Sequence, residues 1–323
     1  MKKILVRAGI VLAVLLVTAA GLAVYIYHAL NVEGEYFDSN GVRINYFVKG
    51  EGTSVILVHG LAINAEGNWM APGIFQRLAK KYRVIAFDNR GHGRSDKPYD
   101  PGQYGTEMVE DIIRLMDHLD IQKAHVVGYS MGGFIVLKLI AMHPDRLLSA
   151  APCGAGWAAN PEKDLALLDQ VADDLDRGEG FKRLLEFLEP TGQKPSKARV
   201  AAANAAMLAI NDTKAVAAVM RSIKQLQVTE AELRANTVPT LAVIGEKDPL
   251  KVYADQMAAV MSNLQLVVAP GGNHMTTLRK KECTAALDRF LAEHSPPADN
   301  LKTATVAFPG RRQNGVIPAK AAD

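Results

Sequence analysis

A serine with the surroundings of a catalytic nucleophile lies near the middle of the chain. Gly128, Ser130 and Gly132 form a Gly-x-Ser-x-Gly pattern between an apolar run and a helical pattern that stops at Pro144. A sharp turn from strand to helix strains the serine backbone and exposes its hydroxyl. The glycines leave room where strand and helix meet, and the helix N-terminus can hold an anion. We therefore predict that Ser130 is a nucleophile.

An acid and a histidine that could activate this serine follow it in the chain. A serine hydroxyl is a weak nucleophile until a neighbouring base takes its proton. Asp248 and His274 each come just after an apolar, strand-like run. We expect His274 to be the base and Asp248 to orient its imidazole. Asp88 and Glu246 are alternative acids, but they are less well placed.

The loop His59-Gly60-Leu61 follows another apolar run and could support the same chemistry. Gly60 has no side chain, so the backbone there can approach a ligand closely. His59 could orient this loop, although a structural histidine is the default interpretation.

Apolar runs alternate with helical patterns along most of the chain. This alternation predicts a mainly parallel sheet with helices on both faces. In such sheets ligands bind at the carboxyl ends of the strands, where Ser130, Asp248 and His274 all lie. The predicted strands are 42–48, 54–60, 82–88, the run from 124 into the serine motif, 147–151, 240–245 and 264–268. The predicted helices beside them are 74–81, 106–119, 131–143 and 278–294.

The alternation stops between residues 156 and 236, where the sequence is helical without a strand pattern. We predict that residues 156–236 form a helical cap inserted into a core made of 36–155 and 237–294. Met207 and Met220 could line an apolar space, although packing of the cap helices against one another is the simpler interpretation. The cap is expected to cover the serine and to set the size of the substrate.

The first 35 residues combine basic side chains with a long uncharged run. Residues 8–27 carry no charge and follow Lys2, Lys3 and Arg7. An apolar helix of about 20 residues spans the bilayer core. We predict an anchor and tether over 1–35, with residues 8–27 in the bilayer and the catalytic domain on the non-cytoplasmic side, the periplasm in a Gram-negative bacterium. A cleaved signal peptide, giving a secreted protein, is the alternative.

Composition excludes several other kinds of protein. Of the 323 residues 49% are hydrophobic and 22% charged, as in an ordinary globular protein. The net charge of +3 comes from basic residues near both ends, so no nucleic-acid surface is expected. Cys153 and Cys283 form neither a metal-binding spacing nor a disulfide framework. Residues 295–323 lack periodicity and are expected to form a disordered tail.

Five motifs in this order resemble those of the α/β-hydrolase superfamily, over about residues 36–294. They are His59-Gly60-Leu61 for the oxyanion loop, Asp88–Ser95 for a turn of the esterase, epoxide-hydrolase and dehalogenase branches, Gly128–Gly133 for the nucleophile elbow, Gly245–Asp248 for the acid loop and Gly272–His274 for the histidine loop. The order serine, aspartate, histidine is that of the family's triad. The resemblance also implies that the backbone N–H groups of Leu61 and Met131 hold the oxyanion that forms when the serine attacks a carbonyl. Similar epoxide hydrolases and dehalogenases carry an aspartate at the elbow, so Ser130 favours acyl transfer to a serine.

These features predict an α/β-hydrolase fold, with a mostly parallel, doubly wound sheet and an inserted helical cap. The expected activity is that of a serine hydrolase, esterase- or lipase-like, acting on a small-molecule acyl ester without a metal ion or organic cofactor. The same triad could serve a carbon–carbon bond hydrolase or a cofactor-free peroxidase. A non-catalytic ligand-binding protein is less favoured, because binding alone does not require all three residues.

Overall fold

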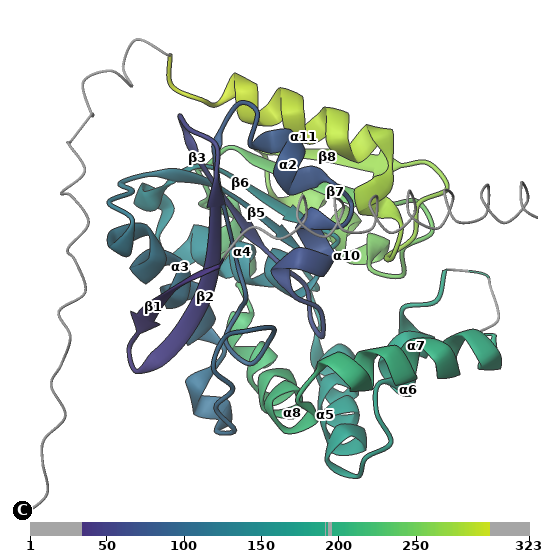
Figure 1. Ribbon diagram of the computed structural model, residues 1–323. Coiled ribbons are helices and arrows are strands. Elements are labelled where there is room, and N and C mark those ends of the chain that lie inside the picture. The colour runs from purple at the N-terminus through teal and green to yellow at the C-terminus, as the bar shows by residue number, and fades with distance from the viewer. Residues whose placement is uncertain (1–33, 191, 193–195, 298–323) are drawn as a thin grey trace, which may run out of the picture.

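Eight strands form one sheet at the centre of the molecule (Figure 1). The computed structural model describes residues 34–190, 192 and 196–297. The strands are β1 (Glu35–Ser39), β2 (Val42–Lys49), β3 (Ser54–Val58), β4 (Arg83–Phe87), β5 (Ala124–Tyr129), β6 (Leu147–Cys153), β7 (Thr240–Gly245) and β8 (Leu264–Ala269). They lie in the order β1-β2-β4-β3-β5-β6-β7-β8. The strands from β3 to β8 are parallel, whereas β2 is antiparallel to both of its neighbours, β1 and β4.

The predicted strands are all present, and β1 is an additional one. β5 is buried along its whole length, as a continuous apolar run in the middle of a parallel sheet should be. β1 is short and lies at the edge of the sheet, with Glu35, Tyr36 and Asp38 exposed. So short and polar a run cannot be told from a loop by its periodicity. The mostly parallel α/β sheet predicted from the sequence is confirmed.

Helices cover both faces of the sheet. The core helices are α2 (Ile74–Leu78), α3 (Thr106–His118), α4 (Met131–Met142), α10 (Lys251–Val260) and α11 (Lys281–Glu293). Short turns of other helix types are η1 (Glu66–Met70), η2 (Pro101–Gln103), η3 (Pro144–Arg146) and η5 (Thr277–Arg279). α10 packs against β7 and β8 and was not predicted. It begins at Lys251, directly after the turn at Asp248 and Pro249, so turn residues stand where a helix start would be recognised.

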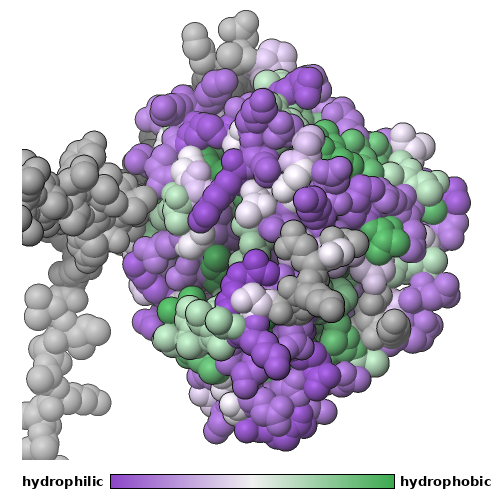
Figure 2. All heavy atoms as spheres, turned by 90° about the vertical axis from the view of Figure 1, so that its right-hand side faces the viewer, coloured by the Kyte–Doolittle hydropathy of each residue, from purple (hydrophilic) through white to green (hydrophobic). Residues whose placement is uncertain are grey.

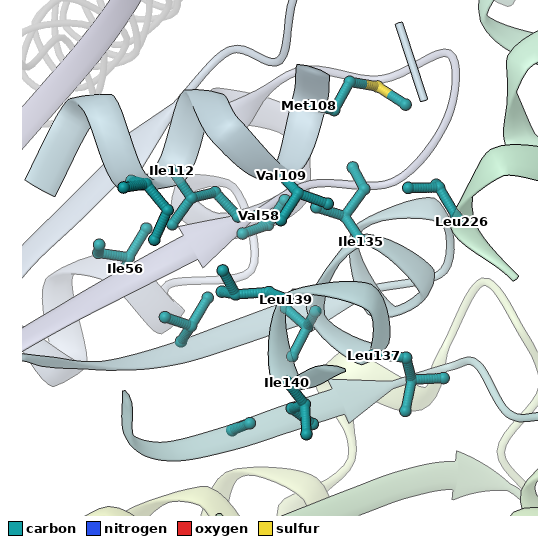
Figure 3. Close-up of a cluster of buried hydrophobic side chains, with 14 of the residues drawn as sticks. Ile56, Val58, Met108, Val109, Ile112, Ile135, Leu137, Leu139, Ile140 and Leu226 are labelled. Carbon is teal, nitrogen blue, oxygen red and sulfur yellow. The ribbon is translucent and has the colours of Figure 1, made fainter. Parts of the chain in front are cut away.

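Two apolar cores lie on the two sides of the sheet. One side packs α3 and α4 against β3 and its neighbours, and Figure 3 shows Ile112, Leu139 and Val58 from these three elements pointing into the same space. The other side packs α2 and α11 around Phe75 and Phe290. Each fully buried side chain of this size contributes about 1.5–3 kcal/mol. The two cores therefore hold the carboxyl ends of the strands in fixed relative positions.

Between β6 and β7 the chain leaves the sheet and forms a separate group of helices, which lies below the sheet in Figure 1. These are α5 (Glu162–Asp176), α6 (Lys182–Phe187), α7 (Lys197–Ile210), α8 (Thr213–Ser222), η4 (Ile223–Leu226) and α9 (Glu230–Arg234). They occupy the residues predicted to form the cap. Their apolar core includes Val171, Phe181 and Val216, and Leu61 and Ala62 from the loop after β3 pack into it.

Both chain ends lie largely outside the described residues. The anchor predicted over residues 8–27 is among them. Within the part that is described, no helix is both long and apolar enough to cross a membrane. Most of the predicted tail is also outside, but Ser295 is described. Its hydroxyl donates to the Leu291 carbonyl at 2.7 Å and lies 3.1 Å from Nε2 of His125.

Candidate active site

The turn between β5 and α4 is strained at a single residue. Ser130 has φ 55° and ψ −118°, an uncommon conformation for a residue with a side chain. A Cβ on Gly128 would lie 2.1 Å from the carbonyl oxygen of Gly132, and a Cβ on Gly132 would lie 2.1 Å from that of Val58. The Ser130 N–H donates to the Cys153 carbonyl at 2.9 Å. Close backbone contacts therefore hold the serine at the carboxyl end of β5.

A row of hydrogen bonds joins the three side chains that the sequence singled out. His274 Nε2 lies 2.9 Å from Ser130 Oγ, and His274 Nδ1 lies 2.9 Å from Asp248 Oδ2. A carboxylate only accepts, so the imidazole carries its proton on Nδ1 and Nε2 is free to accept from the serine hydroxyl. Asp248 is only 2% exposed and His274 only 5%. The arrangement can move a proton from the serine to the imidazole while the carboxylate holds the imidazole in a single tautomer.

Asp248, and neither of the alternative acids, contacts the histidine. Its second oxygen, Oδ1, accepts the Leu250 N–H at 2.9 Å, which fixes the carboxylate in its turn. Asp88 instead accepts two loop N–H groups at 2.9 and 2.8 Å, and burial raises the pKa of its carboxyl. Glu246 accepts the Gly271 N–H at 2.8 Å. Both alternative acids therefore hold loops.

His59 fixes the direction of a neighbouring peptide. Its Nε2 accepts the Asn89 N–H at 2.9 Å, so Nδ1 carries the proton and donates to the Gly60 carbonyl at 2.7 Å. Burial lowers the pKa of His59 to about 4, so the ring is neutral at pH 7. The Gly60 carbonyl and the Leu61 N–H belong to one planar peptide. The bond from His59 therefore also sets the direction of the Leu61 N–H.

The two backbone N–H groups predicted to hold an oxyanion belong to segments that adjoin Ser130. Met131 is the first residue of α4, where N–H groups lack an intrahelical acceptor. A Cβ on Gly60 would lie 3.3 Å from Cβ of Ser130, so the loop over residues 59–62 runs against the serine. Asn68 on η1 accepts the Gly60 N–H at 2.8 Å. Asn68 was not predicted, because no motif marks that stretch.

Tyr129 is a second residue that sequence reasoning missed. Its hydroxyl donates to the backbone carbonyl of His274, and the two rings lie 5.4 Å apart. Burial raises the pKa of Tyr129 well above its usual range, so the phenol keeps its proton. The tyrosine thus ties the histidine loop to the turn that holds Ser130. Its position inside the Gly-x-Ser-x-Gly pattern was a signal that could have been used.

A cavity of about 800 Å³ opens onto Ser130 and His274. Its wall is mainly apolar and comes from both the core and the cap, with Leu61, Trp157, Val171, Leu185, Phe187 and Leu226 among its side chains. Met207 is part of this wall, whereas Met220 is 1% exposed within the cap's own apolar core. Met207 therefore both lines the cavity and packs against the cap core, whereas Met220 only packs within that core.

The face that Figure 2 shows, seen from the right-hand side of Figure 1, is mainly hydrophilic. Apolar side chains gather towards the upper right of this view, with smaller apolar patches elsewhere. Two of the exposed large apolar residues, Ile210 and Met275, also line the cavity. They come from the cap and from the histidine loop, so the two parts of the molecule meet at the cavity.

Comparisons with known proteins agree with this architecture. A model of the alpha/beta hydrolase fold family matches residues 53–280. The dihydrolipoyllysine-residue acetyltransferase component of the acetoin cleaving system of Cupriavidus necator is 38% identical over 39% of this chain and 34% of its own length. A 2-hydroxymuconate semialdehyde hydrolase of Pseudomonas sp. strain CF600 is 35% identical over 39% of this chain and 43% of its own length.

A solved structure extends the likeness to most of the chain. The thermophilic esterase of Thermogutta terrifontis superposes with a TM-score of 0.68 at 22% identity, covering 82% of this chain and 100% of that one. At this identity the likeness concerns the fold alone. Because the family model spans residues 53–280, well over half of the sequence, the chain belongs to the alpha/beta hydrolase fold family.

Proposed function

We propose that this protein is a serine hydrolase that cleaves carboxylic esters by acyl transfer to Ser130. The observation that carries the proposal is the hydrogen-bonded row of Ser130, His274 and Asp248 at a strained turn that faces an apolar cavity. A pure binding protein would gain nothing from such a row. Strain at a residue next to a cavity is typical of functional sites.

Acylation would begin as the substrate carbonyl enters above Ser130. The serine proton passes to His274 Nε2 while Oγ bonds to the carbonyl carbon, and Asp248 stabilises the imidazolium. The N–H groups of Leu61 and Met131 receive the oxyanion. When the tetrahedral intermediate collapses, the bond to the alcohol breaks and the alcohol leaves with the proton from His274.

Deacylation would repeat these steps with water. His274 takes a proton from a water molecule, whose oxygen attacks the ester that links the acyl group to Ser130. The second intermediate collapses, the carboxylic acid leaves, and the proton returns to Oγ. The proton that leaves with the alcohol is thus replaced by one from water, and the enzyme returns to its starting state.

The apolar wall of the cavity favours substrates whose acyl group is apolar. Burial of each methylene contributes about 0.8 kcal/mol, so a mainly apolar cavity favours acyl chains that fill it. The volume of about 800 Å³ is within the usual range for small-molecule sites. Medium-length acyl esters fit these properties.

Carbon–carbon bond hydrolysis is the second candidate. A relative bears the name 2-hydroxymuconate semialdehyde hydrolase, which is why a substrate of this class should be assayed beside esters. A cofactor-free peroxidase is the remaining alternative predicted from the sequence. Nitrophenyl esters of graded chain length, a vinylogous diketone and a peroxide-dependent halogenation assay would be compared with wild-type protein and Ser130→Ala. The proposal requires ester turnover that the substitution abolishes, and turnover of the diketone alone would contradict it.

We further propose that residues 8–27 anchor the enzyme in a membrane, with the catalytic domain on the non-cytoplasmic side. The support is the basic start followed by an uncharged run long enough to span a bilayer. Carbonate washing of membranes from cells that express the full chain, with N-terminal sequencing, tests this. Retention with Lys2 and Lys3 intact is expected. A soluble product that lacks the run would instead indicate a cleaved signal peptide and secretion.

A further inference from the structure

The junction between α7 and α8 joins the cap to two loops of the core. Asn211 Nδ2 donates to the Ala62 carbonyl at 3.0 Å and to the Met207 carbonyl at 2.9 Å. Both acceptors are carbonyls, which sets the orientation of the amide. The next residue, Asp212, accepts the Tyr99 hydroxyl at 2.9 Å. Adjacent cap residues therefore contact two different core loops.

Ala62, the hydrogen-bond partner of Asn211, has an unusual backbone conformation. It has φ 54°, in the left-handed region that residues with a side chain rarely adopt, and it is only 3% exposed. A conformation of this kind costs on the order of 1–3 kcal/mol and persists only where neighbours impose it. Ala62 and Leu61 pack into the apolar core of the cap. The cap therefore supplies both the packing and a hydrogen bond that hold this part of the loop.

The loop over residues 59–62 is thus held from two sides. On the core side, His59 donates to the Gly60 carbonyl and Asn68 accepts the Gly60 N–H. On the cap side, Asn211 donates to the Ala62 carbonyl. Leu61, whose N–H we assign to the oxyanion, lies between these two attachments. The two attachments therefore flank Leu61 on both sides along the chain.

We propose that Asn211 is a positioning residue, through which the cap fixes the Leu61 N–H for the transition state. The inference rests on the proposed function, since it assigns a purpose to the loop. It gives the cap a part in the rate as well as in the choice of substrate. Displacing a catalytic group by about 1 Å can lower a rate about 100-fold, so a single hydrogen bond here has a measurable effect.

The test compares Asn211→Ala with Tyr99→Phe, which removes the neighbouring bond between cap and core and leaves the 59–62 loop untouched. Asn211→Ala should lower kcat about 10–100-fold with KM changed less than about threefold. The loss should be the same for short and long acyl esters, because the oxyanion is common to them. Tyr99→Phe should leave both constants within about twofold of wild type. Asn211→Asp keeps the size of the side chain but loses the donor, and should behave as Asn211→Ala does.

Three results would overturn the inference. A raised KM with unchanged kcat would limit Asn211 to substrate binding. An equal loss of kcat in Tyr99→Phe would show that general attachment of the cap is what matters. A thermal unfolding midpoint that falls in proportion to activity across the three variants would make Asn211 merely structural. Failure of the proposed function is seen separately, as absence of ester turnover in the wild-type protein, and it would overturn this inference as well.

Discussion

The carboxyl ends of the strands and the cap are built by different means. Around Ser130, backbone segments approach so closely that a Cβ on Gly132 would lie 2.1 Å from a carbonyl oxygen. The cap helices instead pack through apolar side chains, with ion pairs at their surface, such as Arg221 with Asp173 at 2.9 Å and with Asp176 at 2.7 Å. Exposed ion pairs contribute only about 0–1 kcal/mol, so the cap depends mainly on apolar packing.

This difference separates the reaction rate from substrate choice. Backbone contacts and a buried hydrogen-bonded row tolerate little change, whereas apolar cores accept substitutions that conserve volume. Substitutions at the strand ends should therefore abolish turnover, and substitutions in the cap should alter which ester is used. Asn211 is the exception, because it connects the cap to the 59–62 loop.

The largest effect is expected for the proposed nucleophile and base. Ser130→Ala and His274→Ala should each lower kcat by about 10⁴–10⁶, because either substitution removes the path by which serine is activated. The double variant should fall little further, since the groups act as a unit. Steady-state kinetics on one nitrophenyl ester checks this. Near-native turnover by Ser130→Ala would contradict the mechanism.

A loss of about 10⁴ in kcat is expected for Asp248→Asn, because the amide would favour the wrong tautomer of His274. Glu246→Gln is the matched control in the same turn, and its side chain contacts the Gly271 N–H and not the histidine. It should retain turnover within about threefold. Equal losses in the two variants would show that the turn, rather than the carboxylate of Asp248, carries the effect.

In the cap, Met207 and Met220 form a natural pair for testing selectivity. Met207→Phe narrows the cavity and should shift the ratio of kcat/KM between long and short esters by about 3–10-fold. Met220→Leu conserves volume at a position buried in the cap's own core, so the ratio should stay near that of wild type. The measurement is a chain-length profile for each variant. Identical profiles would make the cap irrelevant to substrate choice.

The last expected effect concerns stability in acid rather than turnover. Burial lowers the pKa of His59 to about 4, of His92 to about 3 and of His125 to about 4. Below the usual histidine pKa of about 6.5, the unfolded chain takes up protons that the folded chain does not. The free energy of unfolding should therefore be highest above about pH 6.5. It should decrease by roughly 1–3 kcal/mol per histidine as the pH falls towards 4.

His125 offers a control for this trend away from the catalytic row. It lies near the start of β5, hydrogen-bonded to Ser149 at 2.7 Å, whereas Ser130 follows the end of that strand. Urea denaturation of wild type and His125→Gln between about pH 4.5 and about pH 7.5 measures how the free energy of unfolding changes with pH. This free energy should decrease less in the variant than in wild type as the pH falls. The buried carboxyls of Asp88 and Asp111, whose pKa values burial raises, oppose part of the trend in both proteins.

Much of the site could be predicted because its residues adjoin strand ends. Ser130, Asp248 and His274 each follow an apolar run, and the runs of one parallel sheet end at the same edge. The contact of Asn211 with Ala62 joins residues far apart in sequence, and no local pattern records it. The different surroundings of Met207 and Met220 depend on which way each helix faces the cavity, which periodicity alone does not fix.

The most direct test of the central claim is the site at which a fluorophosphonate reacts. The reagent forms a covalent bond with an activated serine and mimics the tetrahedral intermediate. Intact mass and peptide mapping should show one adduct per chain, on the peptide that contains Ser130, in wild-type protein. Ser130→Ala should give no adduct, and His274→Ala should react far more slowly because its serine is no longer activated. An adduct on another residue, or wild-type protein that remains unlabelled, would contradict the assignment of Ser130 as the nucleophile.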